Sequence, residues 1–472
     1  MNHFYCDGLC VRDEYGRQRI FRGVNICLKL KDANVKEAKK NLLKEKLFQN
    51  LKASGVNIVR LGITWATLEE QKGKYSRDMA EVLYRFAKRC EKENIYVMPD
   101  MHQDLFSHYF HGDGAPGWAV DPSTKSKKQL AIWAEGYFYM SGVQRAFADF
   151  WENKNGVQDR FFECWRFLKN ALNGCDNIIG YDFFNEPYLQ SGGREVFLNI
   201  LSNVSVAAGG NIDFHSCFTG GRERRGMILA VLKLLGLIKS PAGFSRLLEK
   251  MNSGEEFARI VSGNENITAR FNETYYQPFF ERACREIGGD LRVFEHNYYS
   301  NLGIPFRIRT PENAVYSPHA YDLFVDSPLY NRHCSNNRLD FILGRIRENQ
   351  LKMNVPVIMG EWGGISKGEN SLRHIEHIMD IFERYQWSSV YWGMNFKRNK
   401  LVDAFNRPYP AAVCGDIEEI RTDSKRRKIL LRWTQQQACS DDSPVKNIFY
   451  IPGRGFTEYT GKQGNNRIEI NY

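Results

Sequence analysis

Short apolar runs alternate with longer segments of helical periodicity between residues 12 and 400. Each run has the length of a buried strand, and helical patterns over residues 37–54, 76–93 and most of 132–172 separate the first of them. The predicted strands cover residues 21–26, 56–62, 95–100, 178–184, 291–295, 314–317, 355–359 and 388–392. Eight strands with polar residues at their carboxyl ends predict an α/β fold, a (β/α)8 TIM barrel, whose active site lies at that face.

The pattern changes after residue 408. Residues 428–434, 447–451, 455–459 and 466–470 are short alternating segments separated by Gly, Asp, Ser or Asn. Such segments are typical of a small all-β domain. We therefore expect a catalytic barrel over residues 1–408 and a C-terminal β-sandwich domain over residues 409–472.

A long insertion, at about residues 189–272, follows the fourth predicted strand. Connections of that length usually have a function or structure of their own. Within it, residues 226–237 are apolar almost all round at helical spacing, with arginines before them and Lys239 after. This favours a short buried helix; the alternative is a lid or a peripheral membrane contact over residues 226–239, with the basic flanks meeting lipid headgroups. The stretch is too short to span a bilayer.

Composition excludes some classes of function. The 472 residues are 43% hydrophobic, as in a globular protein with a large core. The net charge of +10 is spread along the chain, and no helix-turn-helix, finger or RNA-binding signature is present, so we expect no nucleic-acid partner. Weak attraction to anionic membrane surfaces fits this charge better.

The cysteines and the first residues indicate a compartment. Eleven cysteines at irregular spacing, without a C-x-x-C pair, favour reduced thiols over disulfides or a zinc site. The first ten residues lack the pattern of a secretory signal. We expect a cytoplasmic protein, peripheral at membranes if the apolar helix touches one, and no cofactor. His108 and His111 are close in sequence, but no third ligand has matching spacing, so no metal is expected.

Two predicted strands end in glutamate. Glu186 follows the apolar run of residues 178–184 and precedes Pro187, while Glu361 follows the run of residues 355–359. A retaining glycosidase needs two carboxyl groups about 5–5.5 Å apart, and the fourth and seventh strands face each other across a barrel mouth. On this reading Glu361 is the nucleophile and Glu186 the acid/base. The plainer alternative is that Glu186 only terminates a strand.

Two further side chains fit this chemistry. Arg60, at the end of the second predicted strand, would favour ionisation of the nucleophile. Asn185 would hydrogen-bond the sugar 2-hydroxyl, a contact that strengthens in the transition state.

The order of these residues resembles glycoside hydrolase family 5, over about residues 19–400. The motifs that carry the resemblance are Arg60, Asn185-Glu186-Pro187, His319-Ala320-Tyr321, Glu361 and Tyr391-Trp392. The resemblance implies that Tyr321 contacts the nucleophile, that His319 belongs to the substrate site and that Trp392 forms the floor beneath the sugar.

A closer resemblance is carried by residues 100–118, DMHQDLFSHYFHGDGAPGW, and by residues 21–30, FRGVNICLKL. Both are similar to the endoglycoceramidase-related branch, whose members cleave β-glycosidic bonds to ceramide or sterols. The resemblance implies that Lys29, His102 and Asp104 bind the first sugar and places Trp118 among the substrate-binding residues. Plainer alternatives are a strand cap for His102 and core positions for the two tryptophans.

Within this branch, the aromatic loop of residues 106–110 and the aromatic segment of residues 133–150 resemble the intracellular members that act on monoglucosides. The resemblance therefore implies a retaining β-glucosidase that acts on a glucosylated lipid, either glucosylceramide or a steryl β-glucoside. The alternatives are an endoglycoceramidase that releases intact oligosaccharide and a β-glycosidase for small glycosides such as flavonoids. A non-catalytic glycan- or lipid-binding barrel is less expected because both glutamates are present.

Overall fold

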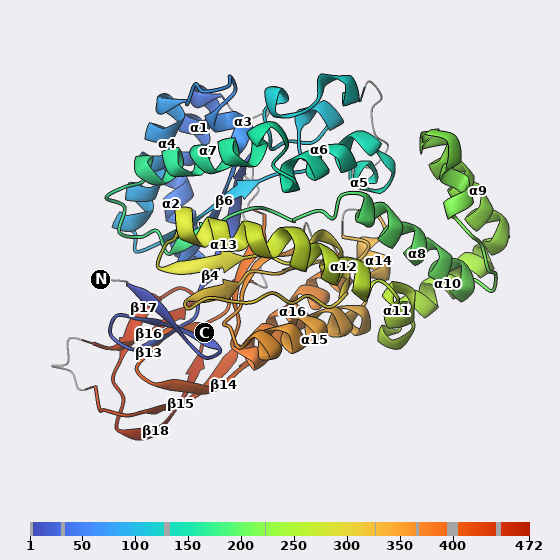
Figure 1. Ribbon diagram of the computed structural model, residues 1–472. Helices are drawn as coiled ribbons and strands as arrows, with labels where there is room; N and C mark the ends of the chain where they lie inside the picture. Colours follow the sequence, from blue (N-terminus) through green and yellow to red (C-terminus); the bar gives the residue numbers. More distant parts are fainter. Residues whose placement is uncertain are drawn as a thin grey trace.

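A parallel barrel surrounded by helices forms most of the molecule in the computed structural model (Figure 1). The structure describes residues 3–29, 34–126, 133–221, 223–325, 327–364, 368–393, 405–439 and 445–472. The barrel strands are β4 (Arg22–Leu28), β5 (Ile58–Thr64), β6 (Tyr96–His102), β7 (Gly180–Asp182), β8 (Leu291–Phe294), β9 (Ala314–Tyr316), β10 (His319–Ala320), β11 (Ile358–Gly363) and β12 (Ser388–Trp392).

Nine strand segments form eight barrel strands. They follow the order β10-β11-β12-β4-β5-β6-β7-β8-β9, and all neighbours run parallel. β9 and β10 are two halves of one strand, interrupted at Ser317-Pro318. Both lie beside β11: Tyr316 of β9 forms a bridge to Val357, the residue before β11, and β10 pairs with β11 itself. That shared neighbour closes the barrel and confirms the predicted (β/α)8 fold.

Helices cover the outside of the barrel. Before the insertion they are α1 (Val35–Leu42), α2 (Glu45–Ala53), α3 (Trp65–Leu68), α4 (Arg77–Lys92), α5 (Glu135–Tyr139), α6 (Ser141–Trp151) and α7 (Val157–Ala171). After it they are α13 (Gln277–Glu286), α14 (Tyr330–His333), α15 (Asn336–Met353) and α16 (Glu369–Tyr385). The single helix predicted over residues 37–54 is two helices, separated at Leu43 and Lys44.

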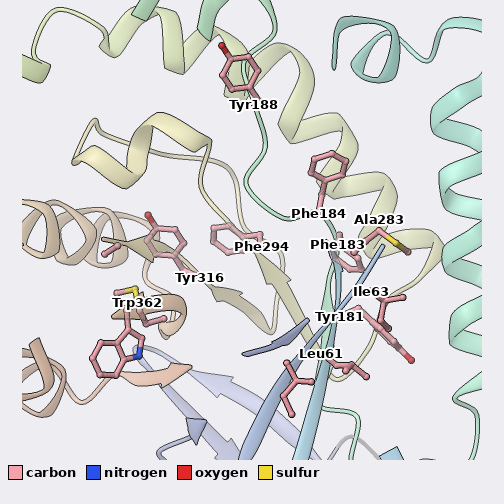
Figure 2. Close-up of a cluster of buried hydrophobic side chains, with 14 of the residues drawn as sticks. Leu61, Ile63, Tyr181, Phe183, Phe184, Tyr188, Ala283, Phe294, Tyr316 and Trp362 are labelled. Carbon is pink, nitrogen blue, oxygen red and sulfur yellow. The ribbon is translucent and has the colours of Figure 1, made fainter. Parts of the chain in front are cut away.

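Apolar and polar side chains alternate along the barrel strands, so the apolar side chains pack in the core and the polar ones face the barrel interior. Leu61 and Ile63 on β5 and Trp362 on β11 belong to the buried apolar layer shown in Figure 2, and the Trp362 ring meets Phe382 of α16 at 5.0 Å. Because successive side chains of a strand point to opposite faces, the intervening residues point into the barrel. The apolar layer thus holds the polar positions in place.

The fourth barrel strand is shorter than predicted. β7 ends at Asp182, although the backbone N–H of Asn185 still donates to Met101 O of β6 over 3.1 Å. At Glu186 the chain adopts φ 45°, a left-handed conformation that turns it out of the strand direction before Pro187. The expectation that Glu186 is the last residue of a strand was therefore wrong by four positions.

The β-rich part of the molecule contains both chain ends. One sheet has the order β1-β2-β3-β13-β16-β17 and the other β14-β15-β18. Their strands are β1 (Phe4–Asp7), β2 (Cys10–Asp13), β3 (Gln18–Arg19), β13 (Tyr409–Val413), β14 (Asp416–Asp423), β15 (Lys428–Gln435), β16 (Asn447–Ile451), β17 (Gly455–Tyr459) and β18 (Gly464–Asn471). The two sheets share one apolar core. The domain boundary at residue 408 stays a prediction. The strand pairing shows in addition that the N-terminal strands β1 to β3 belong to the same sheet as the C-terminal strand β13.

The N-terminal hairpin closes one end of the barrel. Phe4 and Val11 are buried in one cluster with barrel residues such as Ile58, Met98 and Val390. This end is opposite the carboxyl ends of the strands, so the hairpin leaves the predicted active-site face free.

The described residues of the insertion are mainly helical. They include α8 (Ser191–Ala207), α9 (Glu223–Ile238), α10 (Pro241–Asn252), α11 (Gly254–Val261) and α12 (Glu265–Phe271). The favoured prediction of a buried helix was wrong for α9, because one of its faces is exposed along its length. Among the described residues, no single helix is long and apolar enough to cross a membrane, and α9 with α10 meets that criterion only as a pair bent by 101°.

Candidate active site

Glu361 lies on β11 with two hydrogen-bond donors directed at its carboxylate. Arg60 Nη1 donates to Oε1 over 2.8 Å, and the Tyr321 hydroxyl donates to Oε2 over 2.8 Å. The carboxylate is buried, so without these donors its charged form would be unfavourable. The arrangement orients the Glu361 carboxylate and pairs it with a cation, as suits a nucleophile.

Glu186 lies across the barrel mouth on the turn after β7. Asn301 Nδ2 donates to its Oε1 over 2.7 Å, and the Glu186 backbone N–H donates to Glu295 Oε2 over 2.7 Å. The left-handed backbone conformation is costly for a glutamate, and such strain is typical of functional positions.

The two carboxylates are close together. One oxygen from each and a ring nitrogen of His319 all lie within 4.8 Å of one another. His319 Nδ1 is 3.1 Å from Glu186 Oε1 and 3.7 Å from Glu361 Oε2. The separation suits a retaining mechanism, since an inverting pair stands about 6.5–9.5 Å apart to admit a water.

The environment of Glu186 favours its protonated form. Burial raises the pKa of this carboxyl, and the negative charges of Glu361 and Glu295 add to that effect against the opposing influence of His319. The pKa of His319 is itself raised well above its usual value: burial opposes its charge, but Glu295 and Glu361 outweigh burial. The raised pKa favours a proton on Glu186, whereas Glu361 is paired with Arg60, which is the division of roles that an acid/base and a nucleophile need.

Arg60 joins the catalytic carboxylates to the barrel interior. Its guanidinium is fully buried and, besides Glu361, contacts the carboxylates of Asp100, Asp182 and Glu295 at 2.6–2.9 Å. The pKa of Arg60 is raised well above its usual value, because these carboxylates outweigh the effect of burial. One cation therefore neutralises several buried charges at once.

We expect Arg60→Lys to lower the free energy of unfolding by about 3–5 kcal/mol, because a lysine cannot satisfy this set of acceptors and would leave buried carboxylates unpaired. Urea unfolding would measure the loss. Arg259→Lys is the control, since the exposed Arg259 pairs with Glu255 and Glu256 of its own helix. A change below about 1 kcal/mol in Arg60→Lys would contradict the role of this cluster in stability.

A second polar group lies beside the catalytic pair. The Lys29 ammonium forms an ion pair with Asp104 and lies 5.3 Å from the Trp392 ring centroid. Trp392 stacks on His102, with ring centroids 5.6 Å apart and an angle of 11° between the planes. His102 Nδ1 is bonded to Asp100, while its buried Nε2 lies 3.9 Å from Asp104 Oδ2. These residues form a charged and aromatic wall that suits sugar hydroxyls.

Charge interactions hold this wall in its ionised form. The pKa of Asp104 is lowered because Lys29 and His102 outweigh burial. Burial and the adjacent Asp104 raise the pKa of Asp113 to about 6.

Two predicted substrate contacts are less direct. Asn185 accepts from Arg60 Nη2 and donates one amide N–H to Gln103 O, so its second N–H is the group that could reach a sugar. Trp118 lies edge-on to Trp65 at 5.2 Å and donates to Glu69 O. None of these contacts involves the catalytic glutamates, so a substrate role for Trp118 stays a prediction.

Several residues of the site escaped the sequence analysis. Glu295 directly follows β8 and bonds both Arg60 and the Glu186 backbone; it carries the same strand-end signal as the two catalytic glutamates. Asn301 gives no such signal, because it lies on a short 3-10 helix, Tyr298–Leu302, and reaches Glu186 only through the fold. Its side-chain oxygen is 2.6 Å from His296 Nε2, which fixes the amide orientation.

We expect Asn301→Leu to shift the alkaline limb of the kcat/KM profile to higher pH. The amide N–H stabilises the charged form of Glu186, so its loss raises the pKa of that carboxyl further and preserves the active, protonated form over a wider range. Asn203→Leu, a half-buried asparagine on α8, is the matched control. A profile that stays in place, or moves toward lower pH, would count against this coupling.

Within the part of the chain that the structure describes, three groups of side-chain donors have the spacing of metal ligands. They are His102 with Asp104 and Asp113, Glu186 with His319 and Glu361, and Asp100 with Asp182 and Glu295. In each of these groups a side-chain cation already contacts a carboxylate: Lys29 pairs with Asp104, and Arg60 pairs with Glu361 and with all members of the last set. That the site needs no metal stays a prediction.

The chain matches the family model of cellulase (glycosyl hydrolase family 5) over residues 13–216 and 254–398. The match includes every predicted site residue from Lys29 to Trp392. It omits residues 217–253, which contain α9 and α10.

Known proteins with partial similarity carry several related names. An endoglycoceramidase of Cyanea nozakii is 26% identical over 199 residues, 37% of this chain and 40% of the relative. A glucosylceramidase of Cryptococcus neoformans is 22% identical over 184 residues, 29% of this chain and 25% of the relative. The chain thus spans two-fifths or less of the length of these relatives. The crystal structure of Cryptococcus neoformans sterylglucosidase 1 has the same fold, with a TM-score of 0.67, 14% identity and coverage of 99% of this chain and 96% of the other.

Proposed function

The chain belongs to glycosyl hydrolase family 5, and from this membership and the geometry of its two glutamates we propose that it is a retaining β-glucosidase acting on a glucosylated lipid. The observation that carries the proposal is the buried pair Glu186 and Glu361, with oxygens within 4.8 Å of each other and Arg60 bonded to only one of them.

In the first step, the Glu361 carboxylate attacks the anomeric carbon and forms a covalent glucosyl ester. Glu186 gives its proton to the glycosidic oxygen as that bond breaks, so the lipid leaves as a neutral alcohol. Arg60 and Tyr321 hold the attacking carboxylate, and the raised pKa of Glu186 keeps its proton available.

In the second step, Glu186 is a carboxylate and takes a proton from water. The resulting hydroxide equivalent attacks the anomeric carbon, the ester bond to Glu361 breaks, and glucose leaves with its original β configuration. The site then returns to its starting protonation state.

A lipid aglycone is supported by the relatives and by the insertion. The two glucosidases named above are a glucosylceramidase and a sterylglucosidase, and both names describe glucose linked to a lipid. In the insertion, helices α8, α9 and α10 expose large apolar side chains, among them Val206, Leu232 and Phe244, which a soluble glycoside would not require. The endoglycoceramidase relative supports the second candidate, release of an intact oligosaccharide.

Aromatic packing next to Glu186 favours the exo-acting enzyme. Tyr137 of α5 lies 4.9 Å from Tyr188 and 4.5 Å from Tyr298, ring centroid to ring centroid. Its hydroxyl is bonded to Gln103, which in turn donates to Glu186 O. Filled space on this side suits a single sugar better than a long oligosaccharide.

A cytoplasmic location is part of the proposal. All eleven cysteines lie within the described residues and carry free thiols, as expected in a reducing compartment. Fractionation of cells that express the tagged chain would test it.

A product assay on four substrates tests the function. We expect free glucose from glucosylceramide or cholesteryl β-glucoside in detergent, slower release from an aryl β-glucoside, and no product from a ganglioside. Intact oligosaccharide from the ganglioside would establish the endoglycoceramidase instead. Cleavage of the aryl glucoside alone would replace the lipid aglycone with a small molecule.

A further inference from the structure

Helix α9 carries an apolar face that the described residues of the chain leave uncovered. Four of its residues form a stripe at positions i, i+3, i+4 and i+7: Ile228, Val231, Leu232 and Leu235, with 53%, 47%, 59% and 54% of their surfaces exposed. An exposed stripe of branched apolar residues is unusual on a soluble protein and marks an interaction surface.

The opposite face of α9 attaches the helix to the insertion. Ala230 is buried with Phe214 and Cys217, and Leu234 packs against the same cluster. The helix therefore has a protein-facing side and an exposed apolar side, so the exposure does not result from an unpacked helix.

Basic residues frame the exposed stripe. At 100° per residue, Arg225 falls on the same side of α9 as the stripe, and Lys239 directly follows the last residue of the helix; both are exposed. From residue 225 to 250 the chain has five basic residues and one acidic residue, Glu249. An apolar strip between cations matches an anionic lipid surface, where acyl chains lie beneath negative headgroups.

The stripe lies near the mouth of the barrel. α9 packs on α5, whose Tyr137 is bonded to Gln103 beside Glu186. In Figure 1, α9 stands at the edge of the molecule opposite the β-sheets that contain the chain ends. The family match omits the segment that contains α9, so this helix is an addition to the fold that glycosyl hydrolase family 5 shares.

We propose that the outer face of α9 docks the protein on anionic lipid membranes, with Ile228, Val231, Leu232 and Leu235 entering the acyl boundary and Arg225 and Lys239 contacting headgroups. The docking presents the barrel mouth to lipids in the same leaflet. This inference deepens the proposed function. It rests on that function only for the identity of the lipid that the docked enzyme cleaves.

Vesicle flotation of the full chain tests the proposal without any glycolipid. We expect binding to phosphatidylcholine–phosphatidylserine vesicles, weaker binding to phosphatidylcholine alone, and about tenfold or greater loss of binding in Ile228→Glu/Leu232→Glu, because charged groups cannot enter the acyl boundary. The matched control is Leu351→Glu/Leu372→Glu, which alters exposed leucines on α15 and α16 and should bind as the unmodified chain does.

A charge variant separates headgroup contact from insertion. Arg225→Gln/Lys239→Gln should weaken binding to the mixed vesicles and remove most of its salt dependence, with little effect on phosphatidylcholine vesicles. All variants should hydrolyse a soluble aryl β-glucoside at the unmodified rate, which would show that the barrel is intact.

Equal vesicle binding by the Ile228→Glu/Leu232→Glu variant, or no binding by the unmodified chain, would overturn the proposal. A dimer in light scattering that the same variant dissociates, without vesicle binding, would assign the face to a second copy instead. Because the vesicles contain no substrate, vesicle binding by a protein that cleaves no glucolipid would refute only the proposed function.

Discussion

Replacing Glu361 by glycine is expected to reduce kcat/KM for an aryl β-glucoside on the order of 10⁴- to 10⁶-fold, as loss of a nucleophile does in other covalent mechanisms. The variant keeps Arg60 and Tyr321 but has no group that can form the glycosyl ester. Single-turnover and steady-state rates with a dinitrophenyl glucoside would measure the loss. Activity within about tenfold of the unmodified enzyme would eliminate Glu361 as the nucleophile.

The anomeric configuration of the product formed with added azide identifies the removed carboxylate as the nucleophile. In Glu361→Gly the anion can occupy the space of the carboxylate and attack an activated β-glucoside from the side opposite the leaving group. We therefore expect α-glucosyl azide, the inverted product, which proton NMR distinguishes from the β anomer. Circular dichroism of the variant, matched to the unmodified chain, controls for folding.

Replacing Glu186 by alanine is expected to affect substrates according to their leaving groups. A lipid alcohol or an unactivated glucoside leaves poorly without a proton, so its kcat/KM should fall by about 10²- to 10⁴-fold. A dinitrophenyl glucoside needs no proton for the first step and should lose far less. A uniform loss across leaving groups would remove Glu186 from the acid role.

The pH profile of this variant gives a second result. In the unmodified enzyme the rate should fall as pH rises through the raised pKa of Glu186, because only the protonated form can act as acid. The alkaline limb should therefore be absent in Glu186→Ala with the activated substrate. In this variant azide should yield β-glucosyl azide. It attacks the covalent glucosyl ester from the side that the leaving group has vacated, where Glu186 would otherwise activate water.

The order of strands and the two glutamates could be predicted from sequence because both are local signals. A charged residue directly after an apolar run is visible in a few residues, as at Glu361 and Arg60, although the structure places both inside their strands, β11 and β5, rather than at the ends. Glu295, directly after β8, follows an apolar run in the same way. It was not selected because it is not part of a recognised sequence motif such as Asn185-Glu186-Pro187.

Other parts of the site depend on contacts between distant segments, which no local pattern records. Asn301 reaches Glu186 across 115 positions, and the backbone N–H at the left-handed turn of Glu186 donates to the distant Glu295. The face of α9 was misjudged for a related reason: apolar residues on both sides of a helix look the same in sequence whether one side or both are covered.

The pairing of the two chain ends imposes an order on biosynthesis. Arg19 of β3 has its sheet partner at Ala412 of β13, so the N-terminal hairpin leaves the ribosome long before its neighbour exists. At about 5–20 residues per second that interval is roughly 20 to 80 s, during which the hairpin edge is unpaired. Chaperone capture of nascent chains should therefore concentrate on this interval and end when β13 emerges.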